Sequence, residues 1–170
     1  LIIMDHVILV DKEDKEIGQM EKMDAHRKGA LHRAFSVLVF NNKGEMLIQK
    51  RARTKYHSAG LWSNGCCSHP RPGESTDAAA KRRMKEELGI GSRPKYLYKF
   101  IYKVQLGDLI EHELDHVYTC LFDGEPHLNK EEVEAWAYIR PGHLKEKIEE
   151  NPDQYTFWLK QIMNRYEQYL

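Results

Sequence analysis

Residues 68–90 read SHPRPGESTDAAAKRRMKEELGI and contain well-marked helix boundaries. Ser75 or Thr76 can act as the N-cap, because a hydroxyl oxygen there accepts a hydrogen bond from a free backbone N–H. Gly89 suits the residue after the last helical turn, where a left-handed backbone is common. The segment therefore predicts a helix from about Asp77 to Leu88, preceded by a loop rich in glycine and proline.

One face of this helix is apolar but includes a carboxylate. Ala80, Met84 and Leu88 recur at helical spacing, and Glu87 falls between them. Arg83 stands four residues before Glu87, so an ordinary intrahelical ion pair would satisfy the carboxylate and contribute about 0.3 kcal/mol. Coordination of magnesium is the alternative role for Glu87.

Short β-branched and aromatic segments lie on both sides of the helix in the sequence. Phe35–Phe40 and Met46–Arg51 flank a turn at residues 41–44 and predict a hairpin. Further strands are expected at Val7–Val10 and Glu134–Ile139. The pattern predicts an α+β fold in which a mixed β-sheet packs between helices.

The chain shows no internal division. Residues 1–170 contain no repeat, low-complexity tract or Ser/Gly-rich linker, so a single domain is expected. Residues 52–76 have no clear period and are interpreted as a long functional loop. After Pro141, helical patterns continue to the end of the sequence. Five apolar residues of this region share one helical face: Leu159, Ile162, Met163, Tyr166 and Leu170.

The two longest strands are expected at Lys95–Leu106 and Leu109–Phe122. Residues 107 and 108 are Gly-Asp, which suits a two-residue loop of the type II′ kind. Such a loop pairs the last residue of the first strand with the first residue of the second. The register of the whole hairpin follows from this pairing.

Counting back from the turn places Tyr102 opposite Glu113 and Val104 opposite Glu111. Glu111, Glu113 and Asp115 share one face, because side chains alternate along a strand. A solvated acidic face on an edge strand is the ordinary interpretation of such residues. A phenol in contact with a carboxylate would instead tune proton transfer, although a slip of one residue would remove the contact.

A second unusual segment is Asn64–Pro70, which reads NGCCSHP and places Cys67 two residues before His69. A cysteine can serve as an acid, a nucleophile or a metal ligand. Most free cysteines are nevertheless small buried hydrophobes with no chemical role. Both interpretations remain open for this loop.

His26 and His32 lie upstream, on either side of a glycine, and could converge in a loop. Each histidine taken alone is more typical of a structural or exposed position. Together with His69, Glu111 and Glu113, they would form a set of nitrogen and oxygen donors. Such a set suits a divalent metal such as manganese, zinc or magnesium.

The overall charge is balanced, with 26 Lys and Arg residues against 26 Asp and Glu residues. The sequence is 41% hydrophobic and 31% charged, which is typical of a soluble globular protein. A chain without net charge has no general field to attract nucleic acid or a membrane, so neither is expected as a partner. A diphosphate would need a local basic cluster, for which the candidates are Lys22, Arg51, Lys55 and Arg83.

Cysteine content and the first residues indicate a cytoplasmic protein. The cysteines are Cys66, Cys67 and Cys120, an odd number with two adjacent, which makes a poor disulfide framework. Residues 1–6 lack the features of a signal peptide, and no segment approaches transmembrane length. A monomer or weak dimer is expected.

The segment at residues 68–90 resembles the Nudix box, G-x5-E-x7-R-E-U-x-E-E-x-G-U. Ser68 replaces the first glycine of the box, and Arg83 replaces one of its glutamates. The loop Cys66–Pro70 resembles the cysteine loop of type 1 isopentenyl-diphosphate isomerases, whose box departs from the Nudix pattern in a similar way. The matching box positions are Glu74, Arg82, Met84, Glu86, Glu87, Gly89 and Ile90.

This resemblance implies a Nudix-like fold and an isomerase that interconverts isopentenyl and dimethylallyl diphosphate in isoprenoid biosynthesis. Cys67 and Glu113 would add and remove protons on opposite faces of the substrate, with Tyr102 assisting at Glu113. The partner would be a small allylic or homoallylic diphosphate. A divalent metal, manganese, magnesium or zinc, would be bound by His26, His32, His69, Glu111 and Glu113.

The resemblance also implies how the substrate is held. Glu87 would bind a magnesium ion that bridges to the diphosphate, and Trp158 would face the hydrocarbon. The expected diphosphate contacts are Lys22, Arg51, Lys55, Ser68 and Arg83.

Two other classes of function fit parts of the sequence. A Nudix hydrolase of a diphosphate would use Glu86 and Glu87 to hold metals that activate water. Arg83 in place of the box glutamate weighs against hydrolysis. A metal-stabilised domain without catalytic activity would use its histidines only to maintain the fold.

Overall fold

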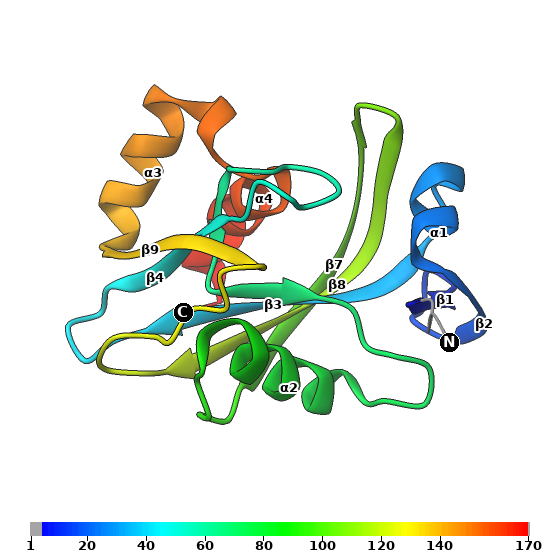
Figure 1. Ribbon diagram of the computed structural model, residues 1–170, viewed down its shortest axis with the longest axis horizontal. Coiled ribbons are helices and arrows are strands. Elements are labelled where there is room, and N and C mark those ends of the chain that lie inside the picture. Colours follow the sequence, from blue (N-terminus) through cyan, green and yellow to red (C-terminus); the bar gives the residue numbers. More distant parts are fainter. Residues whose placement is uncertain (1–4, 170) are drawn as a thin grey trace.

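The computed structural model describes residues 5–169 of the chain. Its centre is a mixed sheet of nine strands (Figure 1). The strands are β1 (His6–Val10), β2 (Glu16–Glu21), β3 (His32–Phe40), β4 (Met46–Arg51), β5 (Trp62–Asn64), β6 (Cys66–Ser68), β7 (Lys95–Leu106), β8 (Leu109–Leu121) and β9 (Val133–Ile139). The α-helices are α1 (Lys22–Lys28), α2 (Thr76–Leu88), α3 (Pro141–Glu150) and α4 (Phe157–Arg165), with short 3-10 turns at Pro152–Gln154 and Tyr166–Gln168. Within residues 5–169, no helix is both long and apolar enough to cross a membrane.

Strand β3 occupies the middle of the sheet. It runs parallel to β8 from the His32–Glu113 pair to the Phe40–Leu121 pair. Along its other edge it pairs antiparallel with β1, β6 and β4. Residues 34–40 read AFSVLVF and are all buried, as expected for a strand that is covered on both faces.

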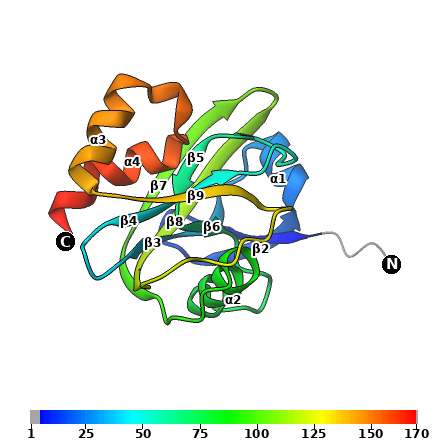
Figure 2. The ribbon, with the colours of Figure 1, turned by 60° about the vertical axis from the view of Figure 1, so that its left-hand side comes forward.

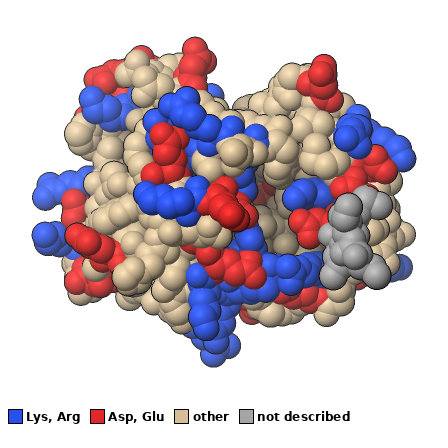
Figure 3. Space-filling model, viewed as in Figure 1, with Lys and Arg blue, Asp and Glu red and all other residues tan. Residues whose placement is uncertain are grey.

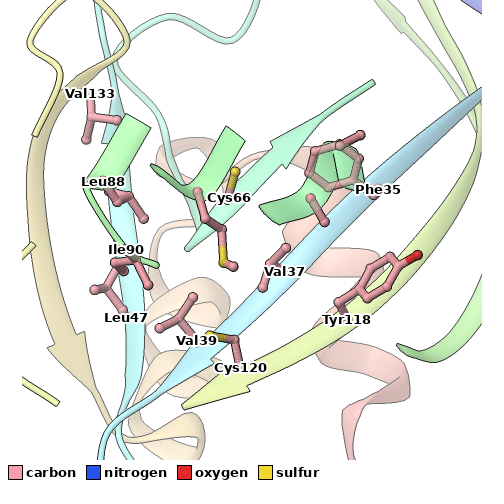
Figure 4. Close-up of a cluster of buried hydrophobic side chains, with 13 residues drawn as sticks. Phe35, Val37, Val39, Leu47, Cys66, Leu88, Ile90, Tyr118, Cys120 and Val133 are labelled. Atoms are coloured by element: carbon pink, nitrogen blue, oxygen red, sulfur yellow. The ribbon is translucent and has the colours of Figure 1, made fainter. Parts of the chain in front are cut away.

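Helices pack on both faces of the sheet, as the sequence predicts. Val37 lies in one buried cluster with Met84 of α2 (Figure 4). Leu38, its neighbour in sequence, points the other way and packs with Leu144 of α3 and Leu159 of α4. Figure 2 shows α2 on one side of the sheet and α3 and α4 on the other.

The predicted helix and its caps are confirmed. The Ser75 side chain accepts a hydrogen bond from the Ala78 backbone N–H at 3.2 Å, so Ser75 is the N-cap. Gly89 has a φ of 66°, the left-handed conformation that ends many helices. The apolar stripe of α2 is buried against the sheet.

Both predicted hairpins are confirmed. Leu106 pairs with Leu109, and this register places Tyr102 opposite Glu113 and Val104 opposite Glu111. Gly107 has a φ of 62°, as the first position of a type II′ turn requires. The shorter hairpin joins β3 to β4 through two residue pairs. The strand boundaries differ from the prediction by one residue at the end of β8 and at the starts of β1 and β9, while β3 begins three residues earlier, at His32.

The interpretation of residues 52–76 as one long loop is wrong in part. Two three-residue strands, β5 and β6, lie inside this range, and α2 begins at Thr76. Gly65 lies between the two strands, where a Cβ atom would come within 2.7 Å of Val39 Cγ2. Strands this short leave too few alternating residues for sequence periodicity to reveal them.

The sequence analysis also missed β2 and α1. His26 therefore lies on a helix, whereas a loop had been expected to bring it near His32. Helix α1 is only seven residues long, and the side chain of Glu21, an uncommon N-cap residue, accepts from the Asp24 N–H at 2.9 Å.

The C-terminal apolar face is confirmed for Leu159, Ile162 and Met163, which are buried. Helix α4 ends at Arg165, so Tyr166 belongs to the following 3-10 turn. Leu170 and residues 1–4 lie outside the described part of the chain.

Candidate active site

A pocket opens on the face of the molecule shown in Figure 3, where basic side chains border the hollow. It brings together segments that are far apart in the sequence, from α1, the loop after β4, β6, α2, the β7–β8 hairpin and α4. The residues of the predicted site that line it are Lys22, Arg51, Lys55, Cys67, Ser68, His69, Arg83, Tyr102, Glu111, Glu113 and Trp158. His26, His32 and Glu87 are also buried but lie behind this lining.

The acidic face of β8 is buried, so its interpretation as a solvated edge is wrong. Glu111 is 1% exposed, Glu113 7% and Asp115 1%. Strand β8 is hydrogen-bonded to β3 on one side and to β7 on the other, so it is not an edge strand. Side chains from other segments, among them His26 and His69, cover its acidic face. The Tyr102 hydroxyl donates to Glu113 Oε2 at 2.7 Å and lies 3.4 Å from Glu111 Oε2. The hairpin register therefore creates the phenol–carboxylate contact that the sequence predicts.

Helix α1 and the start of β3 bring two histidines to these carboxylates. His26 Nδ1 donates to the Lys22 carbonyl at 2.6 Å, and its Nε2 lies 2.8 Å from Glu111 Oε1. Gly29 ends α1 with a φ of 66°, and a Cβ there would lie 3.1 Å from Ile110. A glycine thus lets the chain turn tightly from α1 toward β3.

His32, the first residue of β3, and His69, the residue after β6, both meet Glu113. His32 Nδ1 donates to the Ala30 carbonyl at 2.9 Å, and its Nε2 lies 3.4 Å from Glu113 Oε1. His69 Nε2 lies 2.8 Å from the same carboxylate oxygen. The His32 and His69 rings are 5.0 Å apart between centroids.

The electrostatics of this histidine–carboxylate cluster are set by burial and by close partners. Burial opposes a charge on His26, but Glu111 outweighs burial and raises the pKa of the imidazole. Burial lowers the pKa of His69 to about 4 despite its carboxylate partner. Burial also opposes ionisation of Glu113, yet hydrogen bonds from His32 and His69 hold the pKa of this carboxyl well below its usual range.

The cluster is suited to a divalent metal. In the neutral tautomer with Nδ1 protonated, His26 and His32 direct an Nε2 lone pair at a carboxylate oxygen, and a cation between them would relieve that repulsion. Donor atoms of His26, His32, His69 and Glu113 all lie within 4.8 Å of one another. Glu111 belongs to a second such group, which shares His26 and also includes His57. The predicted donors therefore converge as two groups that meet at His26.

The two adjacent cysteines face different surroundings. Cys66 is fully buried in the cluster beneath α2 (Figure 4), while Cys67 lines the pocket. Asn64 fixes this turn by donating to the Cys66 carbonyl at 2.9 Å and to the Val37 carbonyl at 3.2 Å. Burial raises the pKa of the Cys67 thiol to about 11, so the thiol retains its proton at neutral pH.

On the opposite wall of the pocket, arginines neutralise the carboxylates. Arg83 Nη2 donates to Glu87 Oε1 at 2.8 Å and lies 3.2 Å from Glu132 Oε1. Gln49 donates to the other oxygen of Glu87 at 3.1 Å. The predicted ion pair of Glu87 is thus present, and it is more deeply buried than an exposed helical pair. Glu86, in contrast, sits at the surface, with its side chain 39% exposed.

The remaining basic residues reach the pocket from separate segments. The Lys22 ammonium lies 5.0 Å from the centre of the Tyr56 ring. The Arg51 guanidinium lies 5.1 Å from the centre of the Trp158 ring. Lys55 forms an ion pair with Glu132. These side chains converge in space, as binding of a diphosphate would require.

Trp158 is held at the pocket by its own hydrogen bond. Its indole Nε1 donates to the Ser63 hydroxyl at 2.9 Å, and the residue is 3% exposed. The Ser63 oxygen also lies 3.6 Å from Cys67 Sγ. Indole and thiol are therefore positioned by the same side chain.

Tyr56 and His57 are among the pocket-lining residues that sequence reasoning did not place in the site. Both lie in the segment between β4 and β5, where no periodicity places them on a face. The available signal was a histidine close to Lys55 in a chain with several other candidate ligands. That signal is weak, because nothing in the sequence shows that this segment folds inward.

Comparison with solved structures shows the fold. A Deinococcus radiodurans protein matches with a TM-score of 0.81 at 20% identity, covering 95% of this chain and 98% of its own. A MutT protein from Methanosarcina mazei matches with a TM-score of 0.67 at 18% identity, covering 81% of this chain and 94% of its own. Identities this low support the arrangement of the elements and not the chemistry.

Comparison of sequences gives much closer relatives. Isopentenyl-diphosphate Delta-isomerase 2 of Photorhabdus laumondii is 52% identical over 163 residues, covering 95% of this chain and 92% of the relative. The Delta-isomerase of Serratia proteamaculans is 48% identical over 158 residues, covering 92% and 88%. The family model of the NUDIX domain matches residues 30–159. The chain thus belongs to the Nudix family and, within it, to the isopentenyl-diphosphate Delta-isomerases.

Proposed function

We propose that this protein interconverts isopentenyl diphosphate and dimethylallyl diphosphate, as a step of isoprenoid biosynthesis. The observation that carries the proposal is the arrangement of two proton-transferring groups around one pocket. Cys67 lies on β6 and Glu113 on β8, the strands that flank β3 on its two sides. Both side chains line the pocket that basic residues border.

The chemistry requires a proton to be added at one end of an alkene and another to be removed at the far side. Cys67 begins as the donor, because its pKa of about 11 keeps the thiol protonated. Glu113 begins as the acceptor, because its pKa is held low. The alkene electron pair forms the new C–H bond at the terminal carbon. The electron pair of the C–H bond broken by Glu113 forms the new double bond. Glu113 then releases the proton it has gained to solvent, and the Cys67 thiolate takes one up from solvent, which restores the starting state.

Tyr102 supports this exchange as a positioning residue. Its hydroxyl donates to Glu113 Oε2, which leaves the other oxygen of the carboxylate facing the histidines. A carboxylate held by a phenol cannot rotate freely, so the geometry of proton removal is fixed in advance.

Trp158 would face the hydrocarbon of the substrate. A positive charge that develops on the tertiary carbon is attracted to an indole face, with about 2 kcal/mol available in a desolvated site. The Arg51 guanidinium lies near the same ring. We propose that this contact changes when Arg51 turns toward the diphosphate.

A divalent metal, manganese, magnesium or zinc, would be held by His26, His32, His69, Glu111 and Glu113. Bound there, it would supply Lewis-acid stabilisation of negative charge next to the reacting carbons. The imidazoles are oriented for this role by their bonds to backbone carbonyls. Each such bond leaves Nε2 as the free donor atom.

The diphosphate would be bound on the wall of the pocket that carries Arg83 of α2. Arg83 and the hydroxyl of Ser68 lie at the same pocket as the three more distant cations, Lys22, Arg51 and Lys55. Each oxygen of Glu87 has one partner, from Arg83 or Gln49, and a carboxylate can accept further contacts. Glu87 would therefore bind a magnesium ion that accompanies the diphosphate.

Product analysis tests the proposed function. Purified protein is incubated with magnesium and isopentenyl diphosphate in D₂O, and the products are separated and examined by mass spectrometry. We expect dimethylallyl diphosphate that carries deuterium in the newly formed methyl group. Release of inorganic phosphate or a monophosphate without movement of the double bond would instead indicate a hydrolase.

A further inference from the structure

His57 occupies an unusual position for a loop histidine. It follows β4 by six residues, yet it is 9% exposed and lines the pocket. Its ring contacts Tyr56 at 4.4 Å and Trp158 at 5.7 Å between centroids, edge to face in both cases. These contacts place the imidazole between the aromatic wall of the pocket and the carboxylates of β8.

The nitrogen atoms of His57 are arranged like those of His26 and His32. His57 Nδ1 lies 3.2 Å from the Ser58 hydroxyl, while Nε2 forms a close ion-pair contact with Glu111 Oε1. His57 Nε2 is buried and has no partner with hydrogen-bond geometry in the described part of the chain. The same holds for Nε2 of His32. A nitrogen without a hydrogen bond can serve as a donor to a cation. His116 Nε2 also has no such partner, but among the described residues only His32 and His57 of these three belong to a group of convergent donor atoms.

The backbone is strained where it turns His57 inward. Ser58 has a φ of 51°, a left-handed conformation that is uncommon for a residue with a side chain. The Arg51 guanidinium donates to the His57 carbonyl at 3.2 Å and holds the turn from inside the fold. Local strain of this kind persists where surrounding contacts enforce it and is concentrated at functional sites.

We infer that His57 is an additional ligand of the metal centre, through Nε2 on the side of the cluster formed by His26 and Glu111. Its donor atom lies within 4.8 Å of donor atoms of both residues. With His57 included, the donors are four imidazoles and two carboxylates, a set that suits a six-coordinate borderline metal such as Mn²⁺. This inference rests on the proposed metal-dependent function but concerns affinity and coordination, which are measured without substrate.

Manganese binding to the His57→Phe variant tests the inference. Phenylalanine keeps a ring against Tyr56 and Trp158 but removes the nitrogen. We expect the dissociation constant for Mn²⁺ to rise at least about tenfold, since loss of even an outer-shell partner weakens metal binding by about 10- to 100-fold. Pulsed electron paramagnetic resonance of bound Mn²⁺ should also show coupling to one fewer imidazole nitrogen than in the wild type.

His116→Phe is the matched control. His116 also lies beside a carboxylate, with its Nε2 2.9 Å from Asp14 Oδ2, but it is outside the pocket. Its substitution should leave Mn²⁺ affinity and the nitrogen couplings unchanged. If His57→Phe does not fold, His57→Gln also removes the imidazole and keeps a polar side chain. It should show the same loss of one coupled imidazole nitrogen.

Unchanged Mn²⁺ affinity and an unchanged number of coupled imidazoles in a folded His57 variant would overturn the inference. His57 would then be a hydrogen-bond donor to Glu111 and no more. A second bound Mn²⁺ that is lost in His57→Phe while the first is retained would overturn it as well, because His57 would then belong to a separate site. Neither result bears on the proposed reaction, which the deuterium experiment on the wild type decides independently.

Discussion

The two walls of the pocket both bury carboxylates, but they neutralise them with different bases. On the sheet wall, Glu111 and Glu113 of β8 face histidines. On the helix wall, Glu87 and Glu74 face Arg83 and Arg82. Both walls have hydrogen-bonded carboxylates close to 2.8 Å from nitrogen. They differ in whether the nitrogen can lose its proton.

This difference separates two kinds of site. A guanidinium stays protonated at every accessible pH, so the helix wall is neutralised without any ligand. An imidazole loses its proton near neutral pH, which leaves the carboxylates of the sheet wall without a compensating charge. The helix wall therefore keeps its guanidinium charges at every accessible pH, and these charges can bind an anion. The sheet wall is suited to accept a metal cation.

The largest expected effect is at Cys67, which lies between the two walls. Burial has the largest effect on the pKa of the Cys67 thiol and raises it. The charge of Arg51 lowers this pKa, and the charge of Glu87 raises it. Cys67→Ala should lower kcat for isomerisation by about 10³- to 10⁴-fold, equivalent to about 4–5 kcal/mol. Metal content and thermal stability should remain close to those of the wild type, because the change removes little volume. Rate and bound metal are measured on the same preparation.

Cys66→Ala is the internal control for this substitution. Cys66 is buried under α2 and does not line the pocket, so we expect its loss to affect stability more than rate. Near-normal turnover by Cys67→Ala would show that the thiol is not the proton donor.

The next largest effect is expected from Arg83→Met on the helix wall. Methionine preserves much of the side-chain length but leaves Glu87, 3% exposed, without a positively charged partner on α2. The Cys66 thiol also contacts Glu87, but neither it nor Gln49 carries a compensating charge. Removing one partner of a buried ion pair should lower the free energy of unfolding by about 3–4 kcal/mol. Urea unfolding of the metal-free protein, followed by tryptophan fluorescence, measures the change.

Lys85→Met is the matched variant, because Lys85 is exposed on the same helix. It should change the free energy of unfolding by no more than about 0.5 kcal/mol. If Arg83→Met were equally mild, the helix wall would not depend on its fixed cation, and the contrast between the walls would fail.

The smallest effect concerns pH and the sheet wall. Burial lowers the pKa of His69 to about 4 in the folded, metal-free protein. As the pH falls, His69 is therefore protonated in the unfolded chain before it is protonated in the folded one, and this favours unfolding. The contribution of His69 is complete above pH 6.5 and is lost between pH 6.5 and about 4. The loss should be roughly 3 kcal/mol. His26 has a raised pKa and acts in the opposite direction, gaining stability as the pH falls.

Urea unfolding at several pH values separates these contributions. His69→Asn cannot titrate, so its metal-free form should be less sensitive to pH between 6.5 and 4 than the wild type. The contribution of His26 is common to both proteins and cancels in the comparison. An identical pH dependence in the two proteins would mean that His69 is not held neutral by the sheet wall.

Elements with strong local signals can be predicted from the amino-acid sequence alone. The helix of residues 76–88 follows from its caps and apolar stripe, and the β7–β8 register follows from a Gly-Asp turn. Once that register was counted, the contact of Tyr102 with Glu113 required no tertiary information. The family was also accessible, because the Nudix box and the cysteine loop are local sequence patterns.

The surroundings of those residues depend on tertiary contacts and cannot be predicted from local patterns. The acidic face of β8 is buried because histidines from other segments pack over it, and an alternating pattern cannot distinguish such a strand from a solvated one. Helix α1 and strands β5 and β6 are too short to give a period of their own. His57 reaches the histidine–carboxylate cluster through a strained turn fixed by Arg51, and neither that turn nor its direction is encoded in residue spacing. Local chemistry can be read along a chain, whereas the meeting of distant donor atoms depends on how the sheet brings its strands together.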